Sequence, residues 1–190
     1  MNVLVLGPQG SGKGTQAKRI SAEYGVPHVS TGDMFRAAIA AGSELGLRVG
    51  PIVAVGELVP DDLTIALIRE RLAANDARTG FVLDGFPRNL AQAVALDAML
   101  SEIGRELDSV LFFDLDDAQA TGRVLGRARD EGRSDDAPEV IARRLAIYHE
   151  QTEPVIDHYA GRGALVTLAA HRSVDEVFAE ICAALGRSDP

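Results

Sequence analysis

The sequence contains almost no cysteine: Cys182 is the only one among 190 residues. A lone thiol cannot form an intramolecular disulfide, and structural zinc sites need several cysteines, alone or together with histidines. A chain of this length buries about 70% of its unfolded surface, so it needs neither kind of crosslink to fold. We therefore expect a single domain over residues 1–190, without zinc.

Long apolar runs and clustered positive charge are also missing. No stretch reaches the roughly 20 apolar residues of a transmembrane helix. The apolar opening, MNVLVL, is too short for a signal-peptide core and has no basic leader. The net charge of −9 disfavours binding to a nucleic-acid duplex, which requires concentrated positive charge. We expect a cytoplasmic protein that binds neither membrane nor nucleic acid.

Lysine is nearly absent as well, and one of the two lysines lies in a glycine-rich loop. Of 19 basic residues only Lys13 and Lys18 are lysines. Lys13 stands in GPQGSGKGTQ, residues 7–16 (the phosphate loop), directly after an apolar stretch. Between a strand and a helix, such a loop directs backbone N–H groups at one point, which favours phosphate. The alternative is a glycine-rich turn without function.

The phosphate loop departs from the usual pattern in one position. G-x-x-x-x-G-K-[ST] places a hydroxyl residue after the lysine. Here Gly14 occupies that place and Thr15 follows one residue later. Either this departure weakens the assignment of residues 7–16 as a phosphate-binding loop, or it marks a sub-type of such loops.

Apolar segments of strand length alternate with segments of helix length along the whole chain. Strands are predicted at residues 2–6, 27–30, 80–85, 109–115 and 164–168. Helices are predicted at 12–24, 31–42, 61–75, 89–103, 117–127, 138–159 and 173–185, with short helices in a protruding flap between 44 and 60. This order predicts a three-layer α/β domain with a five-stranded parallel sheet. Its ligands bind at the carboxyl ends of the strands, where the phosphate loop and residues 84–88 meet.

Six motifs, in order and at suitable spacing, resemble the adenylate kinases of the nucleoside monophosphate kinase family. They are GKGTQ (12–16), STGDMFR (30–36), LVPDDL (58–63), GFVLDGFPRNLAQA (80–93), GRSDD (132–136) and RRLAIYHEQT (143–152). The resemblance makes Gly14 a marker of this sub-type. It implies a P-loop kinase fold with a mobile AMP-binding flap (residues 30–59) and a short lid (residues 126–136) of the type without zinc.

The resemblance also implies a reaction: a monomeric enzyme of adenine nucleotide homeostasis and salvage would transfer phosphoryl from MgATP to AMP, reversibly, giving two ADP. The implied ATP contacts are Gly10, Ser11, Gly12, Lys13, Gly14, Thr15, Arg127 and Arg172. The implied AMP contacts are Thr31, Arg36, Glu57, Leu58, Val59, Gly85, Phe86, Pro87, Arg88, Gln92, Arg133 and Arg144. The implied catalytic residues are Lys13, Asp84, Arg88, Arg123, Arg133 and Arg144.

The chemistry of these residue types suits that reaction. The planar fork of arginine neutralises phosphate charge bidentately. Asp84 ends an apolar strand and is expected, with Thr15, to hold Mg²⁺ through water. The histidines (28, 149, 158 and 171) lack metal-binding spacing, so we expect structural or surface roles for them.

Several positions depart from the family pattern and leave alternatives open. Gln9 stands where proline is usual, Glu57 where lysine or glutamine is common, and Arg172 where a glycine lends its carbonyl to the ATP base. Asn89 resembles the uridylate–cytidylate branch, whereas Thr31 favours adenylate. The alternatives are a pyrimidine (UMP/CMP) kinase and a non-catalytic nucleotide-binding module. A guanine-type switch is disfavoured because no N-K-x-D motif exists.

Overall fold

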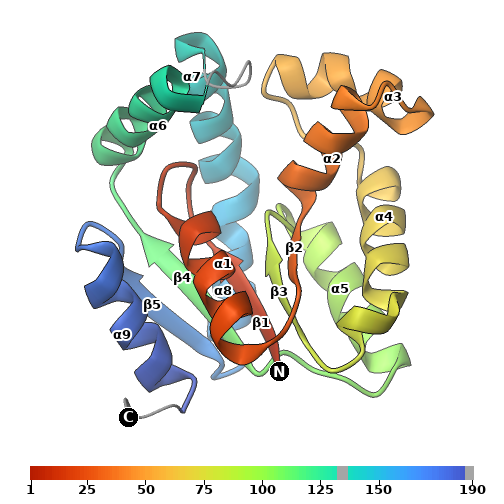
Figure 1. Ribbon diagram of the computed structural model, residues 1–190, viewed down its shortest axis with the longest axis vertical. Coiled ribbons are helices and arrows are strands. Elements are labelled where there is room, and N and C mark those ends of the chain that lie inside the picture. Colours follow the sequence, from red (N-terminus) through yellow and green to blue (C-terminus); the bar gives the residue numbers. More distant parts are fainter. Residues whose placement is uncertain (132–136, 187–190) are drawn as a thin grey trace.

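The computed structural model describes residues 1–131 and 137–186. Its centre is a five-stranded parallel sheet in the order β2-β3-β1-β4-β5 (Figure 1). The strands are β1 (Asn2–Leu6), β2 (His28–Ser30), β3 (Phe81–Asp84), β4 (Ser109–Asp114) and β5 (Leu165–Ala169). All five predicted strands and their parallel arrangement are confirmed. Every residue of β1 and β3 is buried, as expected for central strands covered on both faces.

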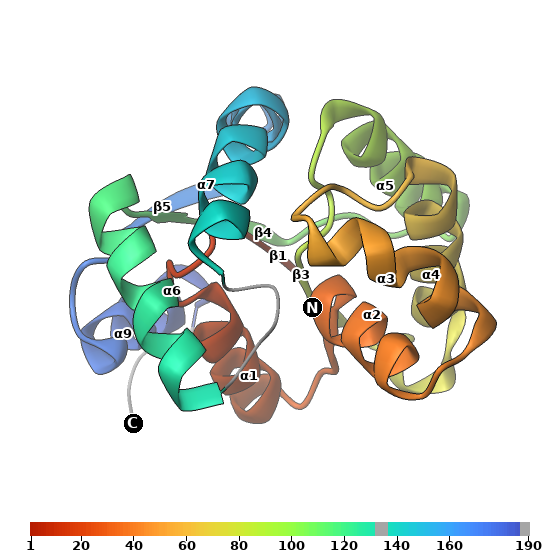
Figure 2. The ribbon, with the colours of Figure 1, turned by 90° about the horizontal axis from the view of Figure 1, so that it is seen from above.

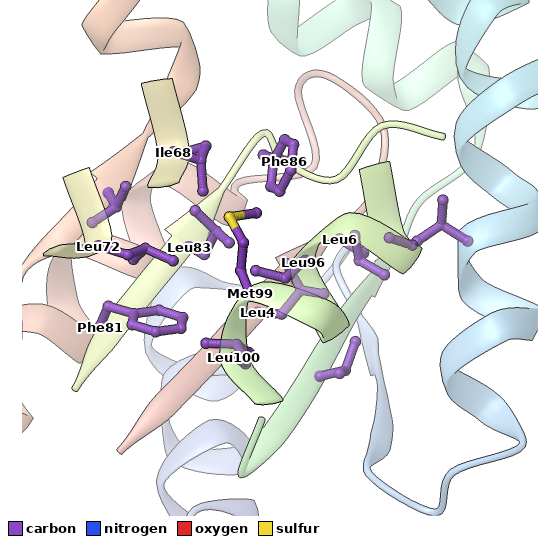
Figure 3. Packing of buried hydrophobic residues seen from close by; sticks show 14 of the residues in the cluster. Leu4, Leu6, Ile68, Leu72, Phe81, Leu83, Phe86, Leu96, Met99 and Leu100 are labelled. Carbon is purple, nitrogen blue, oxygen red and sulfur yellow. The ribbon is translucent and has the colours of Figure 1, made fainter. Parts of the chain in front are cut away.

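Helices cover both faces of this sheet. They are α1 (Lys13–Tyr24), α2 (Thr31–Ala40), α3 (Glu44–Ala54), α4 (Asp61–Ala73), α5 (Leu90–Glu102), α6 (Asp117–Glu131), α7 (Pro138–Ile147), α8 (Glu153–Ala160) and α9 (Val174–Ala184). Residues of β1 alternate between two cores. Leu4 and Leu6 pack with α4, α5 and α8 in the cluster of Figure 3. Val3 and Val5 pack with α1 and α9 on the other face. The predicted three-layer architecture is therefore confirmed.

Two helix boundaries differ from the sequence prediction. The helix predicted to end near residue 127 continues to Glu131 as α6, because the run RARDE contains neither glycine nor proline. The first residues of the predicted lid are thus helical, and residues 132–136 lie outside the described part. The single helix predicted over 138–159 is divided into α7 and α8 by a π-helical turn at Tyr148–Thr152.

The flap (residues 30–59) consists of β2's last residue, α2, α3 and the segment before α4. Phe35, Val49 and Val59 form a small core of its own, separate from the two main clusters. Viewed from above, α6 and α7 lie on one side and α2 and α3 on the other, with the start of α1 between them (Figure 2). Among the described residues no single helix is long and apolar enough to cross a membrane; α2 and α3 meet that test only together, across a bend of 115°.

Candidate active site

The phosphate loop connects β1 to α1 at the carboxyl end of a central strand. Gly10 has φ +80°, and a Cβ atom there would lie 2.5 Å from the carbonyl oxygen of Ala120, so a larger residue would displace backbone. Gly12 precedes α1 in the left-handed conformation (φ 86°), and no described side chain caps that helix. The amino end of α1 therefore presents unpaired backbone N–H groups, as an anion site requires.

Lys13 lies in a buried environment in which nearby cationic side chains outnumber the one nearby carboxylate, that of Asp84. Burial lowers the pKa of its ammonium group to about 8, and Asp84 partly opposes this shift. The nearby guanidinium groups of Arg88, Arg144 and Arg127 lower the pKa further. Four cationic side chains thus gather around one point, and a bound polyphosphate would relieve their mutual repulsion.

Asp84 lies where β3 ends, beside the phosphate loop. Its Oδ2 would be 3.4 Å from a Cβ atom placed on Gly14. On the neighbouring strand, Nε2 of His28 lies 3.3 Å from the same oxygen. His28 pairs in register with Val82, two residues before Asp84, so both side chains lie on one face of the sheet. His28 therefore lines the loop cleft beside Asp84, and the structural or surface role expected for it stays a prediction.

A cleft of about 560 Å³ opens over the phosphate loop, and we call it the loop cleft. It contains most of the residues predicted to bind ATP or act in catalysis. Its lining includes Gly10 to Thr15, Asp84, Arg88, Arg123, Arg127, Arg144 and Arg172. The side chain of Lys13 lies across this loop, where Nζ donates a hydrogen bond to the carbonyl oxygen of Pro8 at 2.9 Å.

A second pocket, the flap pocket, lies under the flap next to the loop cleft. Its lining includes Thr31, Arg36, Glu57, Leu58, Val59, Gly85, Arg88, Gln92 and Arg144. The two pockets share Gly32, Arg36, Gly85, Arg88 and Arg144. They are therefore adjacent, and arginine side chains from three separate segments lie at their junction.

A hydrogen-bond network holds the floor of the flap pocket. Thr31 Oγ1 and Arg88 Nε both donate to the carbonyl oxygen of Gly85, at 2.7 and 2.8 Å. The backbone N–H of Arg88 donates to Gln92 Oε1 at 2.8 Å, and Gln92 Nε2 donates to Asp61 Oδ1 at 2.7 Å. Motifs that are far apart in the sequence thus meet around the turn from Gly85 to Arg88, which includes a cis peptide bond between Phe86 and Pro87.

Some predicted site residues have positions that limit their roles. The side chain of Phe86 is fully buried in the core of Figure 3, so only its backbone faces the turn. Arg123 Nη1 donates to the carbonyl oxygen of Ala170 at 2.9 Å, at the rim of the loop cleft. Arg172 is paired with Glu180 of α9. Arg133 lies outside the described residues.

Sequence reasoning missed two long-range contacts of helix α7. Gln9 Nε2 donates to the carbonyl oxygen of Ile141 at 2.8 Å. Arg143 forms an ion pair with Glu57, with Nη2 2.7 Å from Oε1. The only signal in the sequence was that Gln9 and Glu57 depart from the family pattern; nothing there names their partners.

Two adjoining pockets lined by cationic side chains, one over a phosphate loop and one under a flap, suit two phosphorylated ligands side by side. This arrangement on a parallel sheet of this order defines a phosphate-loop nucleotide kinase.

Comparisons with known proteins specify the class further. The adenylate kinase family model matches residues 5–164. The chain is 47% identical to the adenylate kinase of Stenotrophomonas maltophilia (strain R551-3) over 185 residues, which is 97% of this chain and 99% of that protein. It is 48% identical to the adenylate kinase of Xanthomonas euvesicatoria pv. vesicatoria (strain 85-10) over 187 residues, 98% of this chain and 100% of that one. The chain belongs to the adenylate kinase family and is an ATP:AMP phosphotransferase.

Proposed function

We propose that ATP binds in the loop cleft while AMP binds in the flap pocket, so that the γ-phosphate of one faces the phosphate of the other. The observation that carries this proposal is that Arg88 and Arg144 line both pockets. A guanidinium at the junction contacts both phosphate groups and neutralises charge as they approach each other. Both pockets are built by a single chain, which supports a monomeric enzyme.

The donor nucleotide is held by backbone as much as by side chains. Backbone N–H groups between Gly10 and Thr15 surround the β-phosphate. Lys13 keeps its hydrogen bond to the carbonyl oxygen of Pro8 and donates its remaining N–H groups to the outer phosphates. Arg123 and Arg127 lie along the cleft wall, next to the phosphates and the base. Arg172 contributes at the rim, where its pairing with Glu180 holds it.

The acceptor nucleotide is held under the flap (residues 30–59). Thr31, Gln92 and the backbone of 57–59 surround the adenine, and the turn from Gly85 to Arg88 supports it. Arg36 and Arg88 bind the AMP phosphate. Arg133, which lies outside the described residues, is proposed from its motif alone to contribute positive charge to the transfer.

The residues present fit a magnesium ion that arrives with ATP. Mg²⁺ prefers oxygen ligands and keeps several waters. The carboxylate of Asp84, which would hold the ion through water, lies directly beside the phosphate loop, and the Thr15 hydroxyl is on the exposed first turn of α1. Among the described residues no group of three or more His, Cys, Asp or Glu side chains could hold a metal. When bound, the ion supplies charge neutralisation at the β- and γ-phosphates.

The transfer needs positioning and charge stabilisation more than acid–base chemistry. The phosphoryl group passes through a loose transition state, with charge spread over its equatorial oxygens. Lys13 and the guanidinium groups at the junction stabilise that charge without reorganising. The acceptor is a phosphate oxygen that is largely ionised at neutral pH, since its second pKa is about 6, so no general base is required.

Initial-velocity kinetics test the two-pocket arrangement. Rates are measured with ATP and AMP varied together, in a coupled assay that detects ADP. Simultaneous occupancy predicts reciprocal plots that intersect, because both nucleotides must be bound before transfer. Parallel lines would indicate that the nucleotides use one site in turn, and would contradict the proposal. Replacing AMP by CMP, UMP or GMP in the same assay reports the selectivity of the flap pocket.

A further inference from the structure

Helix α7 carries Arg144, which lines both nucleotide pockets. A guanidinium that stabilises a transition state must be held within about 0.5 Å of its productive position. The helix packs against α6 through Val124, Ile141 and Leu145. No described side chain caps its first turn, which begins at Pro138. Polar contacts from other segments add to this packing in fixing where the first turns of α7 lie.

One such contact comes from the phosphate loop. Gln9 Nε2 donates to the carbonyl oxygen of Ile141 at 2.8 Å, across 132 residues of sequence. Gln9 is only 9% exposed. Its Oε1 is buried and has no hydrogen-bond partner within residues 1–131 and 137–186. Burying an unpaired amide oxygen is unfavourable. The hydrogen bond from the amide nitrogen to Ile141 offsets this cost and holds the side chain in place.

A second contact comes from the flap. Nε and Nη2 of Arg143 both lie 2.7 Å from Oε1 of Glu57. At the preceding residue, Gly56, a Cβ atom would come within 3.1 Å of Arg144 Cγ and 3.0 Å of Val140 Cγ1. The backbone of the flap therefore packs directly against the stem of Arg144, while Glu57 pairs with the preceding residue of the helix, Arg143.

We propose that Gln9 and Glu57 are positioning residues that act through α7 on Arg144. They tie the helix to the phosphate loop on one side and to the flap on the other, so that the guanidinium lies at the junction of both pockets. The proposal rests on the assignment of Arg144 to the phosphates between the two sites. It assigns a role to two residues at which the sequence departs from its family's pattern.

The two contacts differ in expected strength. The Gln9 hydrogen bond is buried, and losing one hydrogen bond of this kind changes an equilibrium or a rate about two- to tenfold. The ion pair is half exposed, with 51% of the Arg143 side chain and 43% of the Glu57 side chain accessible, so water and salt screen it. Its loss is expected to change the rate about twofold.

The test is a double-mutant cycle with Arg144. Gln9→Met keeps length and removes the donor, and Glu57→Gln keeps shape and removes the charge. Each is made in the natural chain and in Arg144→Ala, and kcat and both KM values are measured. In the natural chain we expect kcat to fall about two- to tenfold for Gln9→Met and about twofold for Glu57→Gln. In Arg144→Ala neither substitution lowers activity further, because the group on which both act is gone.

Two controls separate positioning from general destabilisation. Glu102→Gln breaks another exposed ion pair, with Arg69, outside both pockets, and leaves kcat unchanged in either background. Glu57→Arg combined with Arg143→Glu reverses the pair and recovers most of the activity lost in Glu57→Gln. If the turnover of Arg144→Ala is too low to detect, the dissociation constant of AMP, measured by calorimetry for each variant, replaces kcat in the same double-mutant cycle.

Three outcomes would decide against the proposal or its premise. If Gln9→Met and Glu57→Gln lower the activity of Arg144→Ala by the same factor as they lower that of the natural chain, Gln9 and Glu57 act elsewhere, and the proposal is overturned. Unchanged kinetics of Gln9→Met in the natural chain would overturn it as well. Full activity of Arg144→Ala alone would instead refute the role given to Arg144, which distinguishes failure of the site assignment from failure of the positioning roles.

Discussion

The ammonium group of Lys13 donates a hydrogen bond to the carbonyl oxygen of Pro8, 2.9 Å away, so the loop's single lysine lies across the loop itself. This contact keeps a cation at the place where phosphates are expected to bind. Lys13→Met should lower kcat about 10²–10³-fold, since one preorganised donor to a transition state is typically worth that much. Circular dichroism and the melting temperature should be nearly unchanged. Near-normal turnover would refute the assignment of this loop.

The lowered pKa of Lys13 predicts a pH effect on ATP capture. Burial brings the pKa of this group to about 8 in the free protein. The ammonium is fully charged below that pH and loses its proton as the pH rises through it. We therefore expect kcat/KM for ATP to fall above pH about 8. The fall in kcat should appear at higher pH, because bound phosphates raise the pKa of Lys13. Profiles of kcat and kcat/KM that fall together near pH 10.5 would contradict this explanation.

Thr31 is predicted to favour adenine over pyrimidines. Its hydroxyl donates to the carbonyl oxygen of Gly85 and faces the flap pocket, where its oxygen can still accept a hydrogen bond from the base. A polar group left unpaired in a buried site costs about 1–3 kcal/mol. Thr31→Ala should thus raise the use of CMP or UMP relative to AMP, by roughly tenfold. Thr167→Ala, on β5 outside both pockets, is the control. A ratio that does not move in Thr31→Ala would remove this basis for adenine selectivity.

Activity should depend on Mg²⁺ and not on zinc. The described residues contain no cluster of metal-binding side chains, and the whole chain has one cysteine. After chelation, Mg²⁺ alone should restore full activity, and elemental analysis should detect no stoichiometric zinc. Asp84→Asn should raise the Mg²⁺ concentration needed for half-maximal rate, because the carboxylate beside the loop is lost. A requirement for added zinc would contradict the metal assignment.

The sheet and its layers could be predicted from the sequence because local pattern determines them. β1 and β3 are apolar except for Asn2 at the start of the first and Asp84 at the end of the second, and the segment SVDE at 173–176 forms a capping box before α9. The boundary of α6 was not predicted, since polar residues of good helix propensity resemble a loop when charge alone is considered. The π-helical turn after α7 was not predicted either, because the pattern of apolar residues in the sequence does not indicate it.

The candidate site was predictable in its parts but not in its connections. Motif spacing located the loop, the flap and the arginines. It could not show that Gln9 reaches Ile141 or that Glu57 pairs with Arg143, because these contacts join residues 132 and 86 positions apart. The contact of His28 with Asp84 depends on strand register, which sequence reasoning did not assign.

The central claim is that the two pockets are occupied together, with Arg88 and Arg144 between them. The most direct test is binding of a single molecule that spans both pockets, two adenosines joined by five phosphates, measured by calorimetry and by inhibition. The account predicts one molecule bound per chain, and inhibition that is competitive against ATP and also against AMP. Two molecules bound per chain, or competition with only one of the two nucleotides, would contradict it.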